Sequence, residues 1–360
     1  MSCKETRPGT ALEETLKSPP PDQESSRRAE SRRPERVSVV VPLFNKARYV
    51  KRALDSVLRQ TYEDFEAIVV DDGSTDGGAD VVRSCGDGRV RIVAQENAGP
   101  GAARNRGLAE VRTELVSFLD ADDEWLPTFL EENLRTLEAC GPEVSVVCAA
   151  SVVHEPRTGW RPFRNPHRHL REGAWRLSPE TPWKEASAVL DYLQWWKTIS
   201  RVECLRKWGG FFDRGPGGYH GEDLWLSFKV VLNESIVLSF RPLHVYHTEA
   251  SELAPHADAW RDAVRPIAPF LSHVEEIEAV CPEPLREHLR HLLAPFALGT
   301  AKYLASRGQR ELGRDFLDRF DCRSLSPRSR YVRAWLLTSR LRPGSPRSAS
   351  PTPRAPAGPR

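Results

Sequence analysis

The stretch Val37-Ser-Val-Val-Val41, followed by Pro42-Leu-Phe-Asn45, is where the chain changes from polar, irregular sequence to a regular pattern. A continuous run of apolar, β-branched residues is typical of a strand that is covered on both faces of a sheet. Downstream, apolar residues recur at helical spacing from Val50 to Leu58. The segment therefore predicts a buried strand, a polar loop at its carboxyl end and then an amphipathic helix.

The same alternation continues as far as residue 153. Further strands are predicted at 65–70, 90–93, 115–119 and 144–153, and helices at 102–111 and 126–137. Strands that alternate with helices favour an α/β fold with a mostly parallel central sheet and helices on both faces. In such sheets ligands bind beyond the carboxyl ends of the strands, so the residues that follow each strand are the candidates for function.

Composition narrows the class of protein. Hydrophobic residues make up 39% and charged residues 28% of the 360 residues, and the net charge of +2 argues against a nucleic-acid-binding protein. The seven cysteines are dispersed without a C-x-x-C pair, which argues against a disulfide framework or a structural zinc site. The N-terminal residues lack the apolar stretch of a signal peptide, and the run Val144 to Val153 is about half of what a membrane span needs. We expect a cytoplasmic protein.

The two ends of the chain differ from its middle. Residues 1–36 predict a disordered leader, and the Pro- and Arg-rich residues 343–360 predict a disordered tail. Residues 257–341 show helical spacing and predict a small C-terminal helical appendage. The nine arginines between Cys322 and Arg360 favour a solvated end of the chain. The alternative is a peripheral contact of this basic C-terminus with an anionic membrane surface, at the inner face of the membrane.

Two acidic clusters directly follow predicted strands. Asp71-Asp72-Gly73-Ser74 has the composition of a turn, but a doubled carboxylate at the end of a buried strand is also suited to accept hydrogen bonds from a base or a ribose. The carboxylates of Asp120-Ala121-Asp122 repel each other unless a cation neutralises them. Such oxygen ligands suit Mg²⁺ or Mn²⁺ bound together with substrate phosphates; the alternative is a solvated turn that caps the next helix.

Two further segments are ambiguous by themselves. Gly99-Pro-Gly101-Ala-Ala-Arg104 partly matches the dinucleotide-binding fingerprint G-x-G-x-x-G. An arginine replaces its third glycine and the motif follows the third strand, which leaves a nicotinamide enzyme as a minor alternative. Glu222-Asp223 precedes an amphipathic run at 224–232, where acidic residues also favour the start of a helix.

Taken in order, these segments resemble the family-2 glycosyltransferases with the GT-A fold. The resemblance is carried by VVVPLFN at 39–45, ALDSVLRQT at 53–61, IVVDDGSTD at 68–76, GPGAARNRG at 99–107, FLDADD at 118–123, WGGFFD at 208–213 and GEDLW at 221–225. Seven such segments in order are a specific signal where one alone is weak. The resemblance implies a GT-A domain at 37–250, with a nucleotide-sugar-binding half at 37–153 and an acceptor and catalytic half at 154–250.

The resemblance also implies roles for individual residues. The nucleotide sugar would be bound by residues from four of these segments, namely Pro42, Phe44, Asn45, Asp71, Asp72, Gly73, Ser74, Arg104, Asn105, Asp120 and Ala121. Asp122 would ligate a divalent metal, Mn²⁺ or Mg²⁺, and His247 is a candidate second ligand with His244 as its competitor. Asp223, with Glu222 beside it, would be the catalytic general base.

The implied function is inverting transfer of a sugar from a UDP- or dTDP-linked donor to a hydroxyl of a glycan, glycolipid or other acceptor, as in polysaccharide biosynthesis. One alternative is a sugar-phosphate nucleotidyltransferase, which usually has a glycine-rich loop where this chain has Pro42-Leu-Phe-Asn45. Another is a non-catalytic scaffold that binds sugar nucleotides. The acceptor is not readable, and the tryptophans between Trp160 and Trp196 are expected to pack in the core rather than on a sugar.

Overall fold

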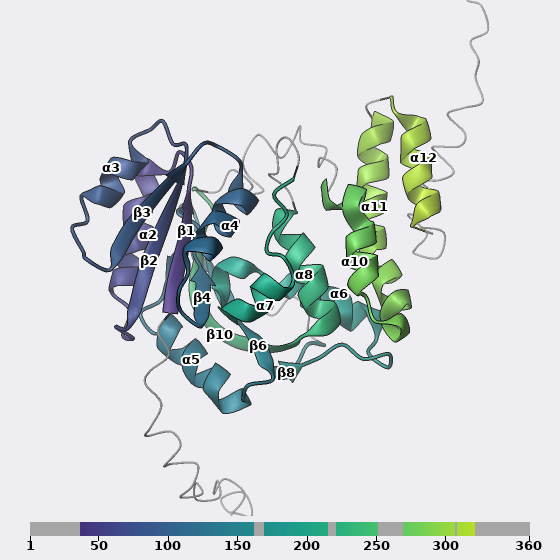
Figure 1. Cartoon of the computed structure of the whole chain (residues 1–360), viewed down its shortest axis with the longest axis horizontal. Coiled ribbons are helices and arrows are strands. Elements are labelled where there is room, and N and C mark those ends of the chain that lie inside the picture. Colours follow the sequence, from purple (N-terminus) through teal and green to yellow (C-terminus); the bar gives the residue numbers. More distant parts are fainter. Residues whose placement is uncertain (1–36, 162–168, 215–220, 251–268, 307, 321–360) are drawn as a thin grey trace, which may run out of the picture. The chain divides into compact units, whose positions relative to one another are not determined.

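The computed structural model describes residues 37–161, 169–214, 221–250, 269–306 and 308–320, and the statements below refer to these residues (Figure 1). They belong to the unit Arg36–Arg360. The other unit, Met1–Glu35, and the tail predicted at 343–360 lie outside the described residues.

The first part of the chain builds a parallel sheet with helices packed on it. Its strands are β1 (Val37–Leu43), β2 (Phe65–Asp72), β3 (Val90–Gln95) and β4 (Leu115–Phe118), in the order β3-β2-β1-β4. The connections contain α2 (Ala47–Leu58), α3 (Gly78–Arg83) and α4 (Pro100–Glu110). All pairs among these strands are parallel, so their carboxyl ends lie at one edge of the sheet. The strands and helices predicted for this part are confirmed.

The sheet continues into a mixed half. Its strands are β5 (Glu124–Trp125), β6 (Val144–Glu155), β7 (Gly159–Arg161), β8 (Gly173–Trp175), β9 (Thr198–Arg201) and β10 (Ser235–His247). The main path runs β3-β2-β1-β4-β9-β6-β10-β5, with β9 antiparallel to both of its neighbours and β6 parallel to β10. Strand β9 thus joins two parallel groups, and the mostly parallel sheet of an α/β fold is confirmed.

Both faces of the sheet are buried at its central strands β1, β2 and β4, as the continuous apolar runs predict. In β1, Val39 and Val41 point into one core together with Leu54 of α2, whereas Val40 points into the other core. This second core also contains Phe118 and extends to the C-terminal helices. The alternation follows from the two-residue period of a strand, and it explains why a strand between two helical layers has no polar face.

The remaining helices cover the mixed half. They are α5 (Phe129–Cys140), α6 (Trp183–Tyr192), α7 (Val202–Lys207), α8 (Glu222–Asn233), α10 (Val274–Val280), α11 (Arg286–Ser306) and α12 (Arg310–Arg319), with 3₁₀ turns at Trp195–Lys197, Pro269–His273 and Glu283–Leu285. The last three helices are the predicted C-terminal helical region, and α11 packs on α6. Helix α5 begins at Phe129, three residues later than predicted. The domain boundaries stay a prediction.

Among the described residues, none of the helices combines the length and the apolar character needed to cross a bilayer.

Candidate active site

The loops that follow β1 and β2 are tied together by Asn45. The Asn45 backbone has a φ of 50°, a left-handed conformation that asparagine tolerates better than most residues. Its side-chain oxygen accepts a hydrogen bond from the Thr75 amide at 2.8 Å, and its own amide donates to the Ser74 hydroxyl at 3.1 Å. The predicted binding residues of both loops therefore form one rigid corner, beside which the Phe44 ring is 36% exposed.

The two carboxylates of Asp71-Asp72 have different surroundings. One oxygen of Asp72 accepts from the Gln95 side chain at 2.7 Å and the Ala98 amide at 2.8 Å. The other accepts from the Gly99 amide at 2.9 Å and the Asn97 side chain at 3.4 Å. These four donors surround the carboxylate, so Asp72 anchors the segment before α4.

Asp71 is the carboxylate of this pair that can serve a nucleotide. One of its oxygens accepts the Ser74 amide at 3.0 Å, which holds the turn in place. Gly73 in this turn has a φ of 76°, and a Cβ there would lie 3.0 Å from the Asn97 amide nitrogen. The turn that the sequence analysis gave as an alternative is thus present. It orients Asp71, whereas Asp72 is bonded to the segment before α4. Direct nucleotide contacts of both residues stay a prediction.

Arg104 lies between two segments that are far apart in the sequence. Its guanidinium donates to Asp120 at 2.8 Å and to Glu222 at 2.7 Å, and its side chain is 5% exposed. Burial alone would lower the pKa of Arg104, but the Asp120 and Glu222 carboxylates outweigh it and raise the pKa. The D-x-D segment and the Glu-Asp pair of α8 therefore meet at one side chain. Contact of Arg104 with a diphosphate stays a prediction.

The helix that carries Arg104 approaches the sheet closely. At Gly107 an added Cβ would lie 2.3 Å from a methyl group of Val40, and at Gly101 it would lie 2.1 Å from the Phe212 carbonyl oxygen. Gly107 thus supplies the close helix–strand packing that a fingerprint glycine at position 104 would give. The amides of Ala98 and Gly99 before α4 are taken by Asp72, which disfavours a pyrophosphate there and weakens the nicotinamide alternative.

Asp223 lies in the first turn of α8, beside the Arg104 bridge. Burial and, to a smaller extent, the Glu222 carboxylate raise the pKa of Asp223 to about 7 against the opposing Arg104 guanidinium. One Asp223 oxygen accepts the Leu224 amide at 2.9 Å. A carboxyl group with a pKa near neutral pH has the proton affinity that a general base needs.

Asp122 is held by a cation of the chain itself. Its carboxylate lies 3.0 Å from the Lys46 ammonium, which also donates to the Ala250 carbonyl at 2.9 Å. Burial and, to a smaller extent, the Asp123 carboxylate raise the pKa of Asp122 to about 7 against the opposing Lys46 ammonium. The Arg52 guanidinium donates to the Asp122 carbonyl. Neither Lys46 nor Arg52 was singled out from the sequence, because only the fold brings α2 and its preceding loop to the D-x-D segment.

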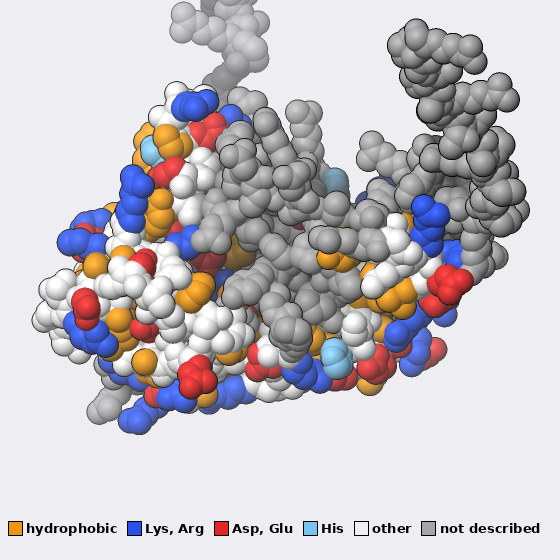
Figure 2. Space-filling model, turned by 90° about the horizontal axis from the view of Figure 1, so that it is seen from above, with side chains coloured by type: hydrophobic (Ala, Val, Ile, Leu, Met, Phe, Trp, Pro, Cys, Tyr) orange, Lys and Arg blue, Asp and Glu red, His pale blue; other side chains and the backbone are white. Residues whose placement is uncertain are grey.

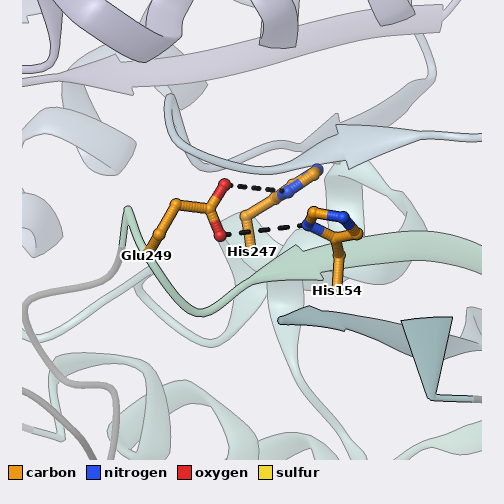
Figure 3. A group of neighbouring side chains, drawn as sticks. All are labelled: His154, His247 and Glu249. Atoms are coloured by element: carbon orange, nitrogen blue, oxygen red, sulfur yellow. Dashed lines mark ion pairs between the residues drawn. The ribbon is translucent and has the colours of Figure 1, made fainter. Parts of the chain in front are cut away.

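The two candidate histidines differ in their surroundings. His244 is fully buried, with its ring nitrogens 3.1 Å from Asp123 and 3.0 Å from the Ser151 hydroxyl. Burial lowers the pKa of His244 to about 3, so this ring is a neutral structural group. His247 instead faces His154 and Glu249, with ligand atoms of the three residues within 4.8 Å of one another (Figure 3). Of the two, His247 has the donor surroundings that a metal requires.

Asn105 has a structural function in this site. Its side-chain oxygen accepts the Phe211 amide at 2.8 Å, and its nitrogen donates to the Phe211 carbonyl and to Asp213, both at 2.9 Å. These bonds clamp the WGGFFD segment onto α4. The side-chain amide of Asn105 is thus engaged within the chain, and its contact with the nucleotide stays a prediction.

The tryptophans of the acceptor half do not behave alike. Trp195 is fully buried, as expected, and its ring nitrogen donates to the Ser227 hydroxyl at 2.9 Å. Trp160 is 60% exposed and Trp183 is 40% exposed, so the expectation of core packing is wrong for these two. Trp160 lies on the short strand β7, and Trp183 lies at the start of α6, where its ring stacks on His291 of α11.

The described side chains on one face of the molecule carry mixed charge. On the described part of the face in Figure 2, acidic and basic side chains are interspersed with hydrophobic ones rather than gathered into a basic stripe. This distribution agrees with the small net charge.

The fold and the site define an α/β protein of the GT-A type, in which acidic segments from separate strands and from α8 meet at one edge of the sheet. The model of the family "Glycosyl transferase family 2" matches residues 38–188, and this region is a family-2 glycosyltransferase domain. An uncharacterised glycosyltransferase of Nostoc sp. is 43% identical over 106 residues, which are 29% of this chain and 33% of that protein. The chain spans a third or less of the first curated relatives that it matches.

Two solved structures share the fold. S. aureus TarS 1–349 in complex with UDP-GlcNAc matches with a TM-score of 0.57 and 20% identity, covering 76% of this chain and 75% of that chain. A mannosyltransferase of Pyrobaculum calidifontis in complex with GDP-Man and Mn²⁺ matches with a TM-score of 0.50 and 18% identity. The match covers 88% of this chain and 92% of that chain. At these identities the likeness establishes the shared GT-A fold.

Proposed function

We propose that this protein is an inverting glycosyltransferase that moves a sugar from a nucleoside-diphosphate donor onto a hydroxyl group of an acceptor. The observation that carries the proposal is the Arg104 bridge. It joins Asp120, at 2.8 Å and within the residues that the family-2 model matches, to Glu222 of α8, at 2.7 Å. Donor-side and base-side carboxylates that meet at one guanidinium are suited to hold a donor and an acceptor hydroxyl together.

The donor side of this proposal lies at the corner of the loops after β1 and β2. The exposed Phe44 ring offers a surface for a base, and Asp71 offers a carboxylate oxygen for a base N–H or a ribose hydroxyl. Structures of the same fold contain UDP-GlcNAc and GDP-Man, which supports a nucleotide-sugar donor as a class. A UDP- or dTDP-linked sugar is the proposed donor.

The base side of the proposal is Asp223. An acceptor hydroxyl attacks an anomeric carbon poorly until its proton begins to move to a base. The Asp223 carboxylate, whose pKa is raised to about 7, takes that proton, and the hydroxyl oxygen bonds to the anomeric carbon as the bond to the diphosphate oxygen breaks. Attack from the face opposite the leaving group inverts the configuration. Glu222, bound to Arg104, positions the segment that carries this base.

A divalent metal fits the residues present. The ring nitrogens of the buried His247 have no hydrogen-bond partner among the described residues, and Asp122 supplies an oxygen once Lys46 yields it. We propose Asp122 and His247 as its ligands. When bound, the ion offsets the negative charge that develops on the departing diphosphate.

The acceptor and the location of the enzyme belong to the same proposal. A glycan or glycolipid acceptor would suit the exposed Trp160 ring, since the apolar faces of sugar rings stack on aromatic side chains. A cytoplasmic enzyme of polysaccharide biosynthesis accords with this acceptor class. The basic C-terminal end, proposed as an alternative contact with the inner face of a membrane, lies outside the described residues.

The experiment is a screen of nucleotide sugars by thermal shift with and without Mn²⁺, followed by product analysis with the best donor. Release of nucleoside diphosphate that disappears in Asp223→Asn supports transfer. Formation of a nucleotide sugar from a sugar phosphate and a nucleoside triphosphate would instead identify a nucleotidyltransferase. Donor binding without any turnover would identify the non-catalytic scaffold.

A further inference from the structure

Three side chains that the sequence pattern did not group lie together where β6 and β10 end. His154 and His247 are register partners on these parallel neighbours, and the Thr248 amide donates to the His154 carbonyl at 3.2 Å. Glu249 follows two residues after the end of β10. Figure 3 shows the Glu249 carboxylate with one oxygen toward each imidazole ring. The cluster is therefore held by paired strand backbones, which fix its geometry.

The ring nitrogens of this cluster lack ordinary partners. His247 is 5% exposed, yet neither of its nitrogens has a hydrogen-bond partner among the described residues, and the same holds for Nδ1 of His154. The Glu249 oxygens lie 3.4 Å from Nδ1 of His247 and 4.0 Å from Nδ1 of His154. Buried polar atoms without hydrogen bonds are costly, and two imidazoles around one carboxylate make a donor set that suits a bound cation.

The groups around the cluster are those that orient metal ligands. The other nitrogen of His247, Nε2, faces the Glu124 carboxylate at 3.6 Å, and Glu249 is held by the Arg52 guanidinium at 3.2 Å. The Trp160 ring packs edge-on against His154 at 4.8 Å between ring centres. A carboxylate behind a ligating histidine fixes which nitrogen faces the metal and increases the basicity of that nitrogen.

We propose that His154, His247 and Glu249 bind a divalent transition-metal ion in preference to Mg²⁺. The role of this ion in catalysis rests on the function proposed above, to which the inference adds His154 and Glu249 as ligands and the kind of ion. Imidazole nitrogen favours transition metals, whereas Mg²⁺ favours oxygen ligands and gives up its waters reluctantly. Lys46 already neutralises Asp122, so the free protein binds the ion chiefly through the histidine cluster.

The test is titration of the full chain with Co²⁺ and with Mg²⁺, without nucleotide, followed by calorimetry and by the visible absorption of Co²⁺. We expect one Co²⁺ per chain and an affinity for Mg²⁺ at least tenfold weaker. His154→Gln and Glu249→Gln should each weaken Co²⁺ binding about tenfold or more and change its absorption spectrum. His273→Gln is the matched control, because His273 faces Glu276 at 3.9 Å on the surface without a second histidine, and its Co²⁺ affinity should equal that of the wild type.

Wild-type Co²⁺ affinity in both cluster variants, or equal affinities for Co²⁺ and Mg²⁺, overturns the inference. If circular dichroism shows that His154→Gln does not fold, the Glu249→Gln variant decides, since the Glu249 side chain is 30% exposed. Transfer that runs equally well with Mg²⁺ and survives in both cluster variants removes this metal site but leaves the glycosyltransferase intact. Co²⁺ binding that depends on His154, without turnover of any nucleotide sugar, retains the site and removes the transferase.

Discussion

The Arg104 guanidinium donates to the Glu222 carboxylate at 2.7 Å, across 118 positions of sequence, in a contact that is almost completely buried. The same guanidinium holds Asp120, so one side chain of α4 joins the end of β4 to the start of α8. A buried cation between two carboxylates is stable only as long as both partners remain, because the removal of any one leaves an uncompensated buried charge.

Replacement of Arg104 by Leu should therefore reduce both stability and turnover. Two carboxylates would remain facing each other without a cation, and we expect a loss of about 3–5 kcal/mol in the free energy of unfolding. Arg104→Lys should lose less, because it keeps the charge but cannot donate to both acids in the same geometry. Urea unfolding of the two variants checks this order, and an Arg104→Leu variant as stable as the wild type would contradict it.

Asp223→Asn should abolish most of the activity and alter its pH dependence. The base must be ionised, and burial raises its pKa to about 7, so wild-type kcat/KM should rise with pH through about 7 and then level off. Loss of the base should cost about 10²–10⁴-fold in kcat and remove this rise. The measurement is kcat/KM against pH with the same donor. A wild-type profile that is flat across neutral pH would exclude Asp223 as the titrating base.

The same substitution should stabilise the fold at alkaline pH. Because the pKa of Asp223 is raised from 3.8 to about 7 in the folded chain, the folded state keeps a proton that the unfolded state has lost between these values. Its contribution to stability is therefore largest at acid pH and is lost as the pH rises toward 7. The Asp223→Asn variant has no such loss. At pH 8 its free energy of unfolding should therefore exceed that of the wild type by on the order of 1–4 kcal/mol, and at pH 4 by much less. Thermal unfolding at both pH values measures the difference.

Substitutions of Asp71 and Asp72 should have different effects, one on donor binding and the other on stability. Asp72→Ala leaves the Ala98 and Gly99 amides without their acceptor, and we expect a loss of about 2–4 kcal/mol in the free energy of unfolding. Asp71→Asn keeps the fold, since the amide oxygen still accepts the Ser74 amide, and should weaken donor binding about tenfold. Chemical unfolding and donor titration of both variants test this. Equal effects of the two variants on stability would contradict the assignment.

Two helical glycines should respond oppositely to alanine. At Gly101 a Cβ would lie 2.1 Å from the Phe212 carbonyl oxygen, so α4 must move and Gly101→Ala should cost about 3 kcal/mol or more. At Gly299 in α11 a Cβ meets nothing within 4 Å, and Gly299→Ala should stabilise by about 0.4–1 kcal/mol. Melting temperatures of the two variants provide the comparison. A neutral Gly101→Ala variant would show that α4 is free to shift from the WGGFFD segment.

Local patterns were sufficient for the first, parallel half of the sheet. The apolar run at Val37–Val41 predicted β1 and its burial on both faces, because a two-residue period alone decides which face each side chain meets. The order of strands and helices then predicted the parallel sheet, and the strand ends predicted where the acidic segments gather. These features depend on neighbours within a few residues, and the sequence contains them directly.

The tertiary structure alone decided which of the candidate residues remain available to a ligand. Asp71 and Asp72 are adjacent in sequence, but only the approach of 95–99 surrounds the Asp72 carboxylate with donors. Lys46, Arg52, His154 and Glu249 join the site only because α2 begins at the edge where β6 and β10 end. The residues that bury a site residue or pair with its charge come from segments far apart along the chain, so no rule of residue spacing can predict them. The periods of strands and helices, by contrast, can be read from neighbouring residues.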